Sequence, residues 1–208
     1  MKSIISVLSL LSVLITSCAE MTDKKSIEIA NSIDTLIAIP DTTIDMSLLH
    51  YDNKTSIWTV DNQRYSGYAV SYYQDGVLKG KIGFFDGRKQ NQATQWFPDR
   101  HLKRISNYHK GRLNGIKKSW SPDGNHILIS HLNYYRGKAH GTQTFWYPTG
   151  ELYKKLNLNM GREEGIQQAF RKNGELYANY EAKEGRIFGL KKAALCYGLE
   201  DESIKNEN

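Results

Sequence analysis

Apolar and polar residues alternate along most of the chain after residue 66, in short runs separated by glycine-containing turns. Leu78, Ile82 and Phe84 show this alternation in the first run. A period of two residues is typical of strands whose successive side chains face opposite sides of a sheet. Turns such as Ser-Pro-Asp-Gly at residues 121–124 join the runs; Pro presets one backbone angle and Gly takes a left-handed conformation. The pattern predicts a series of β-hairpins.

Glycines place these hairpins on a regular grid. Each repeat opens at one glycine. A glycine nine residues later marks its first turn, a further glycine marks its second turn, and the next opening position follows four residues after that. A fixed period near 24 residues indicates a repeat protein, in which each unit buries apolar surface against its neighbours. We therefore expect an all-β fold, an elongated single-sheet array of five antiparallel β-hairpin repeats. The opening positions are Gly67, Asn91, Gly115, Gly141, Gly165 and Gly189, at steps of 24, 24, 26, 24 and 24 residues.

Three places depart from this grid. Asn91 replaces an opening glycine, which is a mild change because Asn tolerates a left-handed backbone. Arg100 replaces the glycine of a first turn, after Pro98 and Asp99, and predicts a different turn there. The third repeat is two residues longer between its turns, over residues 126–135, which predicts longer strands or a bulge.

Aromatic residues recur on the same grid, five positions after each of the first five opening positions. They predict a structural aromatic column of cross-strand contacts along the sheet. Its central member, Trp120, is expected to be buried and to matter more for stability than Trp58, which precedes the repeats. Further aromatic residues off this column either form an exposed platform for a partner or are covered by other parts of the chain. The column consists of Tyr72, Trp96, Trp120, Trp146 and Phe170, and the off-column residues are Tyr68, Tyr73, Phe97 and Tyr147.

Units such as GTQTFWYPTGELYKKLNLNMGREEG, at residues 141–165, resemble the MORN-variant repeat of the YwqK-like antitoxin family. The resemblance covers residues 65–190 and is specific for the repeat. It implies a row of antiparallel hairpins in one elongated sheet and no shared enzymatic chemistry. The family name also leaves open an immunity or antitoxin-like protein that neutralises a specific toxin.

The first residues are typical of an export signal. Lys2 precedes an apolar stretch over residues 4–15 that is too short to form a stable transmembrane helix. The sequence Ile15-Thr16-Ser17-Cys18 resembles a bacterial lipobox, which implies cleavage before Cys18 and a diacylglycerol on its sulfur. The alternative is an ordinary signal peptide with a coincidental cysteine. We expect a lipoprotein anchored in the bacterial cell envelope, and Ala19, rather than Asp, favours the outer over the inner membrane.

These patterns divide the 208 residues into segments. Residues 19–50 contain no aromatic residue and many charged ones, as expected of a tether. The other cysteine, Cys196, is expected to be a small buried apolar residue rather than part of a disulfide. The predicted segments are a signal peptide at 1–17, a lipidated tether at 18–50, an N-terminal cap or partial repeat at 51–66, five repeats at 67–189, and a C-terminal cap and tail at 190–208.

The sequence shows little sign of catalytic chemistry. Its six histidines form neither a helical pair nor a Cys-His metal pattern, so no metal site is expected. The glycines lead into strands and not into a helix N-terminus, so they do not form a phosphate-binding loop. We therefore predict no catalytic residues and no cofactor. The net charge of +6 is too modest to indicate a nucleic-acid partner.

A more informative pattern concerns the position that follows the glycine of each second turn. This position always holds Lys or Arg. Residues 67–189 contain 20 Lys and Arg against 10 Asp and Glu, whereas 19–66 and 190–208 are net acidic. A basic array binds anionic headgroups, polysaccharides or an acidic protein, unless these residues are ordinary turn residues in solvent. We expect a non-enzymatic, lipid-anchored envelope protein whose repeat surface binds a protein or an envelope polymer. The predicted binding edge consists of Arg88, Arg112, Lys138, Arg162 and Arg186.

Overall fold

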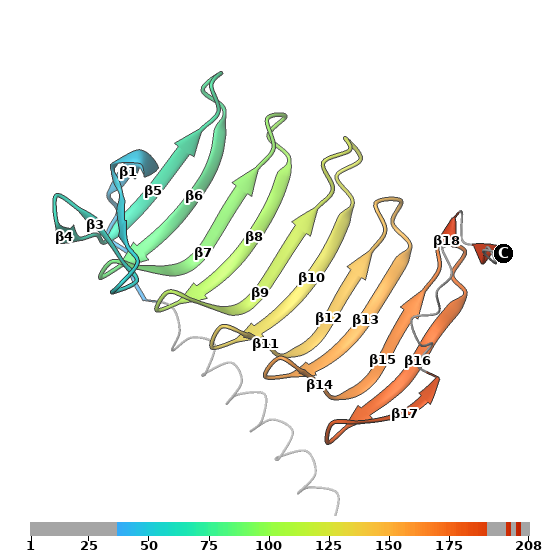
Figure 1. Cartoon of the computed structure of the whole chain (residues 1–208). Helices are drawn as coiled ribbons and strands as arrows, with labels where there is room; N and C mark the ends of the chain where they lie inside the picture. The colour runs from blue at the N-terminus through green and yellow to red at the C-terminus, as the bar shows by residue number, and fades with distance from the viewer. Residues whose placement is uncertain (1–36, 191–198, 201–202, 205–208) are drawn as a thin grey trace, which may run out of the picture. The chain divides into compact units, whose positions relative to one another are not determined.

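The structure is a computed structural model that describes residues 37–190, 199–200 and 203–204. It is all-β, with a long and mostly antiparallel sheet of consecutive hairpin strands, as the repeat pattern predicted (Figure 1). No helix within these residues is long and apolar enough to span a membrane. The predicted signal peptide, Cys18 and Cys196 lie outside the described residues.

Five hairpins lie side by side in the order in which they occur in the chain (Figure 1). Their strands are β5 (Gly67–Tyr72) and β6 (Leu78–Phe85), β7 (Arg88–Trp96) and β8 (Leu102–His109), β9 (Arg112–Trp120) and β10 (Leu128–Tyr135), β12 (Gly141–Trp146) and β13 (Leu152–Asn159), and β15 (Gly165–Phe170) and β16 (Leu176–Lys183). The remaining strands after the first hairpin are β11 (Lys138–Ala139), β14 (Arg162–Glu163) and β17 (Arg186–Leu190), together with the separate pair β18 (Leu199–Glu200) and β19 (Ser203–Ile204).

The second turn of each repeat is a two-residue hairpin turn. In the turn between β6 and β7, Asp86 and Gly87 both have positive φ, at 49° and 71°. Positive φ at both central residues defines the type I′ turn, whose twist matches that of the strands it joins. Glycine at the second central position adopts this backbone without a Cβ clash. The corresponding residue pairs of the next four repeats also have positive φ, so the same tight turn recurs along the array.

The first turns are alike even where the glycine is missing. Arg100 has a φ of 70°, and its N–H donates to the carbonyl of Phe97 at 2.9 Å. The N–H of Gly76 makes the same bond in the first repeat, to Tyr73 at 3.0 Å. The prediction of a different turn at Arg100 is therefore wrong, because pairing of the flanking strands holds this arginine in the left-handed conformation. Asn91, with a φ of 58°, is left-handed as predicted.

The two extra residues of the third repeat lie in its first turn. The N–H of Ser121 donates to the carbonyl of Ile127 at 2.8 Å, whereas in the second repeat Phe97 pairs with His101 at 2.9 Å. Strands β8 and β10 both contain eight residues, so the predicted longer strands are wrong. A bulge lies between Leu128 and Ser130, but other hairpins have one at the same place, so it does not accommodate the insertion.

The best-buried core lies at the N-terminal end of the array. Its centre is Ala69, Ile82 and Phe84, and Phe84 is 0% exposed. Trp58 packs against Phe84 with ring centroids 5.7 Å apart. The covering elements are β1 (Thr43–Asp45), parallel to β5, the 3₁₀ helix η1 (Met46–Leu48), and a three-stranded sheet of β2 (His50–Asp52), β3 (Ile57–Val60) and β4 (Gln63–Arg64).

This cap includes part of the predicted tether. The N–H of Tyr68 donates to the carbonyl of Thr42 at 2.7 Å, and the apolar side chains of Ile44 and Met46 pack on the core. Asp45 caps η1 by accepting the N–H of Ser47 at 2.8 Å. Because β1 pairs with the first strand of the array, it also covers an edge that would otherwise attract other strands.

The aromatic column is less buried than the sequence suggested. Tyr72 is 52% exposed, and Trp96, Trp120, Trp146 and Phe170 are half-buried. Trp120 is thus not in a closed core, whereas Trp58 packs against one, so on the structure we expect Trp58 to contribute more to stability.

Two of the off-column aromatic residues connect neighbouring repeats. The hydroxyl of Tyr73 donates to the carbonyl of Trp96 at 2.8 Å, and that of Tyr147 donates to the carbonyl of Phe170 at 3.0 Å. Phe97 is buried. These three side chains therefore support the sheet and do not form an exposed platform.

Buried glutamines join later repeats. The N–H of Asn133 donates to Gln143 Oε1 at 3.2 Å, and Gln143 Nε2 donates to the carbonyl of Asn133 at 2.9 Å. In the next repeat Asn157 and Gln167 form the same pair of bonds, at 3.0 and 2.7 Å. Two positions pair between β10 and β12, and two between β13 and β15. Because the backbone pairing between these strands is so short, each glutamine amide instead bonds the N–H and the carbonyl of the asparagine on the neighbouring strand. We call these pairs amide clamps.

Candidate functional site

The second turns of successive repeats form a row along one edge of the sheet. The N–H of Gly111 donates to the carbonyl of Lys89 in the preceding repeat at 2.8 Å. The N–H of Gly137 donates to the carbonyl of Leu113 at 2.7 Å, and the N–H of Gly161 bonds the preceding repeat in the same way at 2.8 Å. These bonds fix the spacing between turns, so a residue that follows each turn recurs along this edge.

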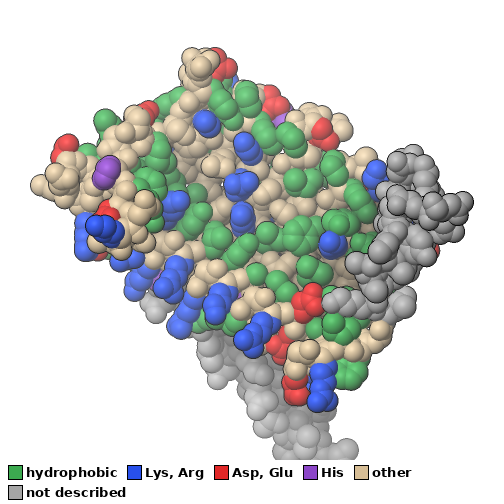
Figure 2. All heavy atoms as spheres, in the orientation of Figure 1, with side chains coloured by type: hydrophobic (Ala, Val, Ile, Leu, Met, Phe, Trp, Pro, Cys, Tyr) green, Lys and Arg blue, Asp and Glu red, His purple; other side chains and the backbone are tan. Residues whose placement is uncertain are grey.

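The five basic residues singled out in the sequence occupy that position. Figure 2 shows Lys and Arg side chains gathered along the lower edge of the sheet, where the second turns lie. We call these five residues the basic edge. They are the first residues of β7, β9, β11, β14 and β17, namely Arg88, Arg112, Lys138, Arg162 and Arg186.

The basic edge carries little compensating negative charge. Arg88 is half-buried, and the other four side chains are exposed. Within the described ranges, the ion pairs are Arg64–Asp86, Arg171–Glu175 and two that link histidines to Asp99, so none involves the basic edge. The turns nearer the C-terminus contain Glu163, Glu164 and Glu184, whereas the acid at the second turn of the first repeat, Asp86, is paired with Arg64. Positive charge is therefore concentrated at the second turns of the first three repeats, which precede β7, β9 and β11.

A hollow of about 530 Å³ adjoins this part of the edge. Its lining residues come from β2, β3 and the turn between them on one side, and from β7, β8, the following turn and the first residue of β9 on the other. They include four cations and three aromatic rings, and no carboxylate. Its volume is in the range of small-molecule sites. The cations are Arg88, Lys89, Lys110 and Arg112, and the rings are those of Tyr51, Trp58 and Tyr108.

Lys89 connects the two walls of this hollow. Its Nζ lies 5.6 Å from the ring centroid of Trp58 and 5.5 Å from that of Tyr108. Cation–π contacts of this kind hold the ammonium in place while leaving its charge without a counterion. The N–H of Trp58 donates to the carbonyl of Gly87 at 2.8 Å, and this bond connects β3 to the turn between β6 and β7. The aromatic wall is therefore held against the cations.

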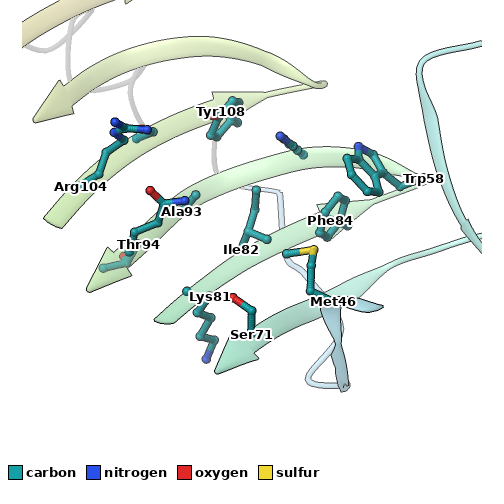
Figure 3. A pocket seen from close by; sticks show the side chains of 14 residues that line it. Met46, Trp58, Ser71, Lys81, Ile82, Phe84, Ala93, Thr94, Arg104 and Tyr108 are labelled. Carbon is teal, nitrogen blue, oxygen red and sulfur yellow. The ribbon is translucent and has the colours of Figure 1, made fainter. Parts of the chain in front are cut away.

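A smaller cavity of about 170 Å³ shares Trp58, Lys89 and Tyr108 with the hollow. Figure 3 shows Ile82, Phe84 and Tyr108 on the same side of the strands, with Trp58 and Met46 at one end. Arg104 lies at the other end. The two cavities together provide apolar and aromatic surface beside positive charge.

The middle of the sheet is also cationic. Burial lowers the pKa of Lys117, and the positive charge of Arg104 lowers that pKa further. Burial likewise lowers the pKa of His131, with a smaller contribution from the charge of Lys118. Positive charge on these two side chains is thus disfavoured first by desolvation and then by a neighbouring cation.

The sequence identified Arg88 and Arg112 but not the residues that complete the hollow. Lys110 is a central residue of one second turn and Lys89 follows another by two positions, yet neither position is basic in every repeat. Trp58 lies outside the repeats, so the 24-residue period says nothing about it. The structure also brings Asp99, His101 and His126 together, although no spacing in the sequence indicated a cluster there.

A scan of the sequence against protein-family models gives no match, and a search among curated proteins finds no significant match.

Proposed function

We propose that the protein is a non-enzymatic, lipid-anchored protein of the bacterial cell envelope that binds an anionic partner through its basic edge. The partner is either an envelope polymer, including lipid headgroups, or an acidic protein surface. The observation that carries this proposal is a row of basic residues that form no ion pair among the described residues. Two of them, Arg88 and Arg112, line a hollow together with Lys89 and Lys110, and that lining contains no carboxylate.

The spacing of the edge suits an extended anionic partner. Each repeat adds two strands, which places successive basic residues about 10 Å apart. This spacing is close to the Debye length at physiological salt, so each cation acts largely on its own part of the partner. Several weak contacts on one polymer or surface raise the overall affinity by multivalency.

The hollow adds a more specific contact. A phosphate or carboxylate seated there would meet two guanidinium groups, which can form paired hydrogen bonds with such anions. The adjoining rings of Trp58, Tyr51 and Tyr108 provide stacking surface for a sugar or another apolar group. Lipidation at Cys18 would keep this surface close to the membrane, where anionic envelope components are abundant.

The test is binding of a lipid-free form, Cys18→Ser, to lipopolysaccharide and to phosphatidylglycerol vesicles, with phosphatidylcholine vesicles as the uncharged control. We expect binding to an anionic target that weakens with added salt. Replacing all five edge residues with Gln should reduce this binding without changing the melting temperature appreciably, since exposed charges contribute little stability. Absence of salt-dependent binding to every anionic envelope component would contradict the proposal for polymers and headgroups and leave an acidic protein as the partner.

A further inference from the structure

Two neighbouring first turns carry the residues that depart from the repeat grid. The turn between β7 and β8 contains Asp99, Arg100 and His101, with Arg100 in place of the usual glycine. The turn between β9 and β10 contains the two-residue insertion and His126. Since β8 pairs with β9, the two turns adjoin each other, at the edge opposite the basic edge (Figure 1).

From this juxtaposition we propose that Asp99, His101 and His126 bind a divalent transition-metal ion such as Zn²⁺. Asp99 Oδ1 lies 3.4 Å from His101 Nδ1, and Asp99 Oδ2 lies 2.8 Å from His126 Nε2. One ligand atom from each residue lies within 4.8 Å of the other two. Donors from two different turns, with His101 and His126 25 residues apart in the chain, thus lie close enough together to share one ion.

These separations suit a small ion with nitrogen and oxygen ligands. Zinc binds histidine nitrogen and carboxylate oxygen at about 2.0–2.2 Å, so tetrahedral ligands lie roughly 3.3 Å from one another. The side chain of His101 is 62% exposed, so turning towards the ion would require only that its ring leave the stack on His126. Two nitrogen donors disfavour Ca²⁺ and Mg²⁺, which prefer oxygen ligands. Three protein ligands leave a fourth position for water or a group from a partner.

His126 is held in place for this role. Its side chain is 13% exposed, and its ring lies 5.6 Å from Phe97 and stacks on His101 at 3.9 Å. Its φ of 49° lies in the left-handed region, as it does for other turn residues of the array. Its Nδ1 is buried without a hydrogen-bond partner among the described residues, so Asp99 alone fixes the polar orientation of the ring.

Asp99 is oriented by the turn itself. The backbone N–H of His101 donates to Asp99 Oδ1 at 3.1 Å, which points the carboxylate towards both rings. The site therefore does not depend on the basic edge or on the hollow, and it would persist if the proposed anion-binding function were wrong.

The experiment measures Zn²⁺ binding to the lipidated protein, purified in detergent without a polyhistidine tag and stripped with a chelator. We expect one Zn²⁺ per chain by titration calorimetry, an increase in melting temperature with Zn²⁺, and no effect of Mg²⁺ or Ca²⁺. The variants His126→Asn and His101→Gln should each weaken Zn²⁺ binding by about 10-fold or more, since loss of outer-shell partners alone costs about 10- to 100-fold. Asn is chosen at residue 126 because it tolerates the left-handed backbone.

His140→Gln is the matched control, because His140 is an exposed histidine on the opposite edge of the same sheet. It should bind Zn²⁺ like the wild type. Equal binding by all variants would assign the ion to other histidines, and no binding at millimolar Zn²⁺ would show that the cluster is only a hydrogen-bonded contact. Either result overturns the proposal. If His126→Asn fails to fold, the exposed His101→Gln still decides.

Discussion

The amide clamp at Gln167 provides a direct test of how the repeats are joined. Gln167 is 1% exposed, and its side chain bonds both the N–H and the carbonyl of Asn157, at 3.0 and 2.7 Å. Gln167→Leu keeps a similar volume but leaves these backbone groups without partners. A buried group left unsatisfied costs about 1–3 kcal/mol, so the variant should lose about 2–4 kcal/mol of unfolding free energy.

The control is Gln168→Leu, which changes the adjacent, half-buried glutamine on the other face of β15. This change should alter stability by less than about 0.5 kcal/mol. Urea unfolding followed by tryptophan fluorescence and by circular dichroism measures both midpoints, and coincidence of the two signals justifies a two-state fit. Equal shifts for the two variants would show that the clamp does not join the repeats and would refute this reasoning.

Three further predictions concern other parts of the chain. Cells fed a clickable fatty acid should label the wild type but not Cys18→Ala; an equally labelled variant would rule out lipidation at that residue. Trp58→Ala should cost about 3 kcal/mol in urea melts and more than Trp120→Ala, because Trp58 packs on the buried core; the opposite order would contradict the assigned core. Burial and the charge of Lys118 lower the pKa of His131 in the folded chain. As the pH falls, this histidine is therefore protonated at a higher pH in the unfolded chain than in the folded one. Stability should therefore fall as the pH drops below about 6.5, and less so in His131→Gln; identical pH profiles would refute this assignment.

The hairpin array could be predicted because its determinants are local and periodic. A turn such as Asp86-Gly87 requires two residues with positive φ, and glycine at a fixed spacing marks each such requirement. A residue that always follows that turn must recur along one edge. The basic edge was therefore accessible from the sequence together with the fold.

Other features depend on contacts that have no period. Arg100 adopts the turn of its glycine counterparts because pairing of β7 with β8 outweighs its own backbone preference. The position of Trp58 over Phe84 depends on how the cap packs on the array, and no repeat specifies that packing.

The amide clamps did carry a signal in the sequence. Gln143 and Gln167 stand two positions after their opening glycines, and Asn133 and Asn157 stand eight positions before them. The signal was missed because buried polar side chains in a sheet are rare, and glutamine in an alternating pattern is normally assigned to the solvent side. The Asp99 cluster, by contrast, joins two irregularities, and their proximity follows only from the pairing of β8 with β9.

The central claim is that the position of the cations along the basic edge, and not the net charge of the protein, produces binding. The most direct measurement compares two lipid-free variants of equal charge in salt-dependent binding to lipopolysaccharide. One replaces the five edge residues with Gln, and the other replaces five basic residues elsewhere on the array. These control residues are exposed and lie away from the second turns: Lys79, Lys81, Arg100, Lys155 and Lys172. We predict that the edge variant binds more weakly and with a flatter salt dependence, while the control variant binds nearly as well as the wild type. Equal weakening of both variants would contradict the claim, since net charge alone would then account for the binding.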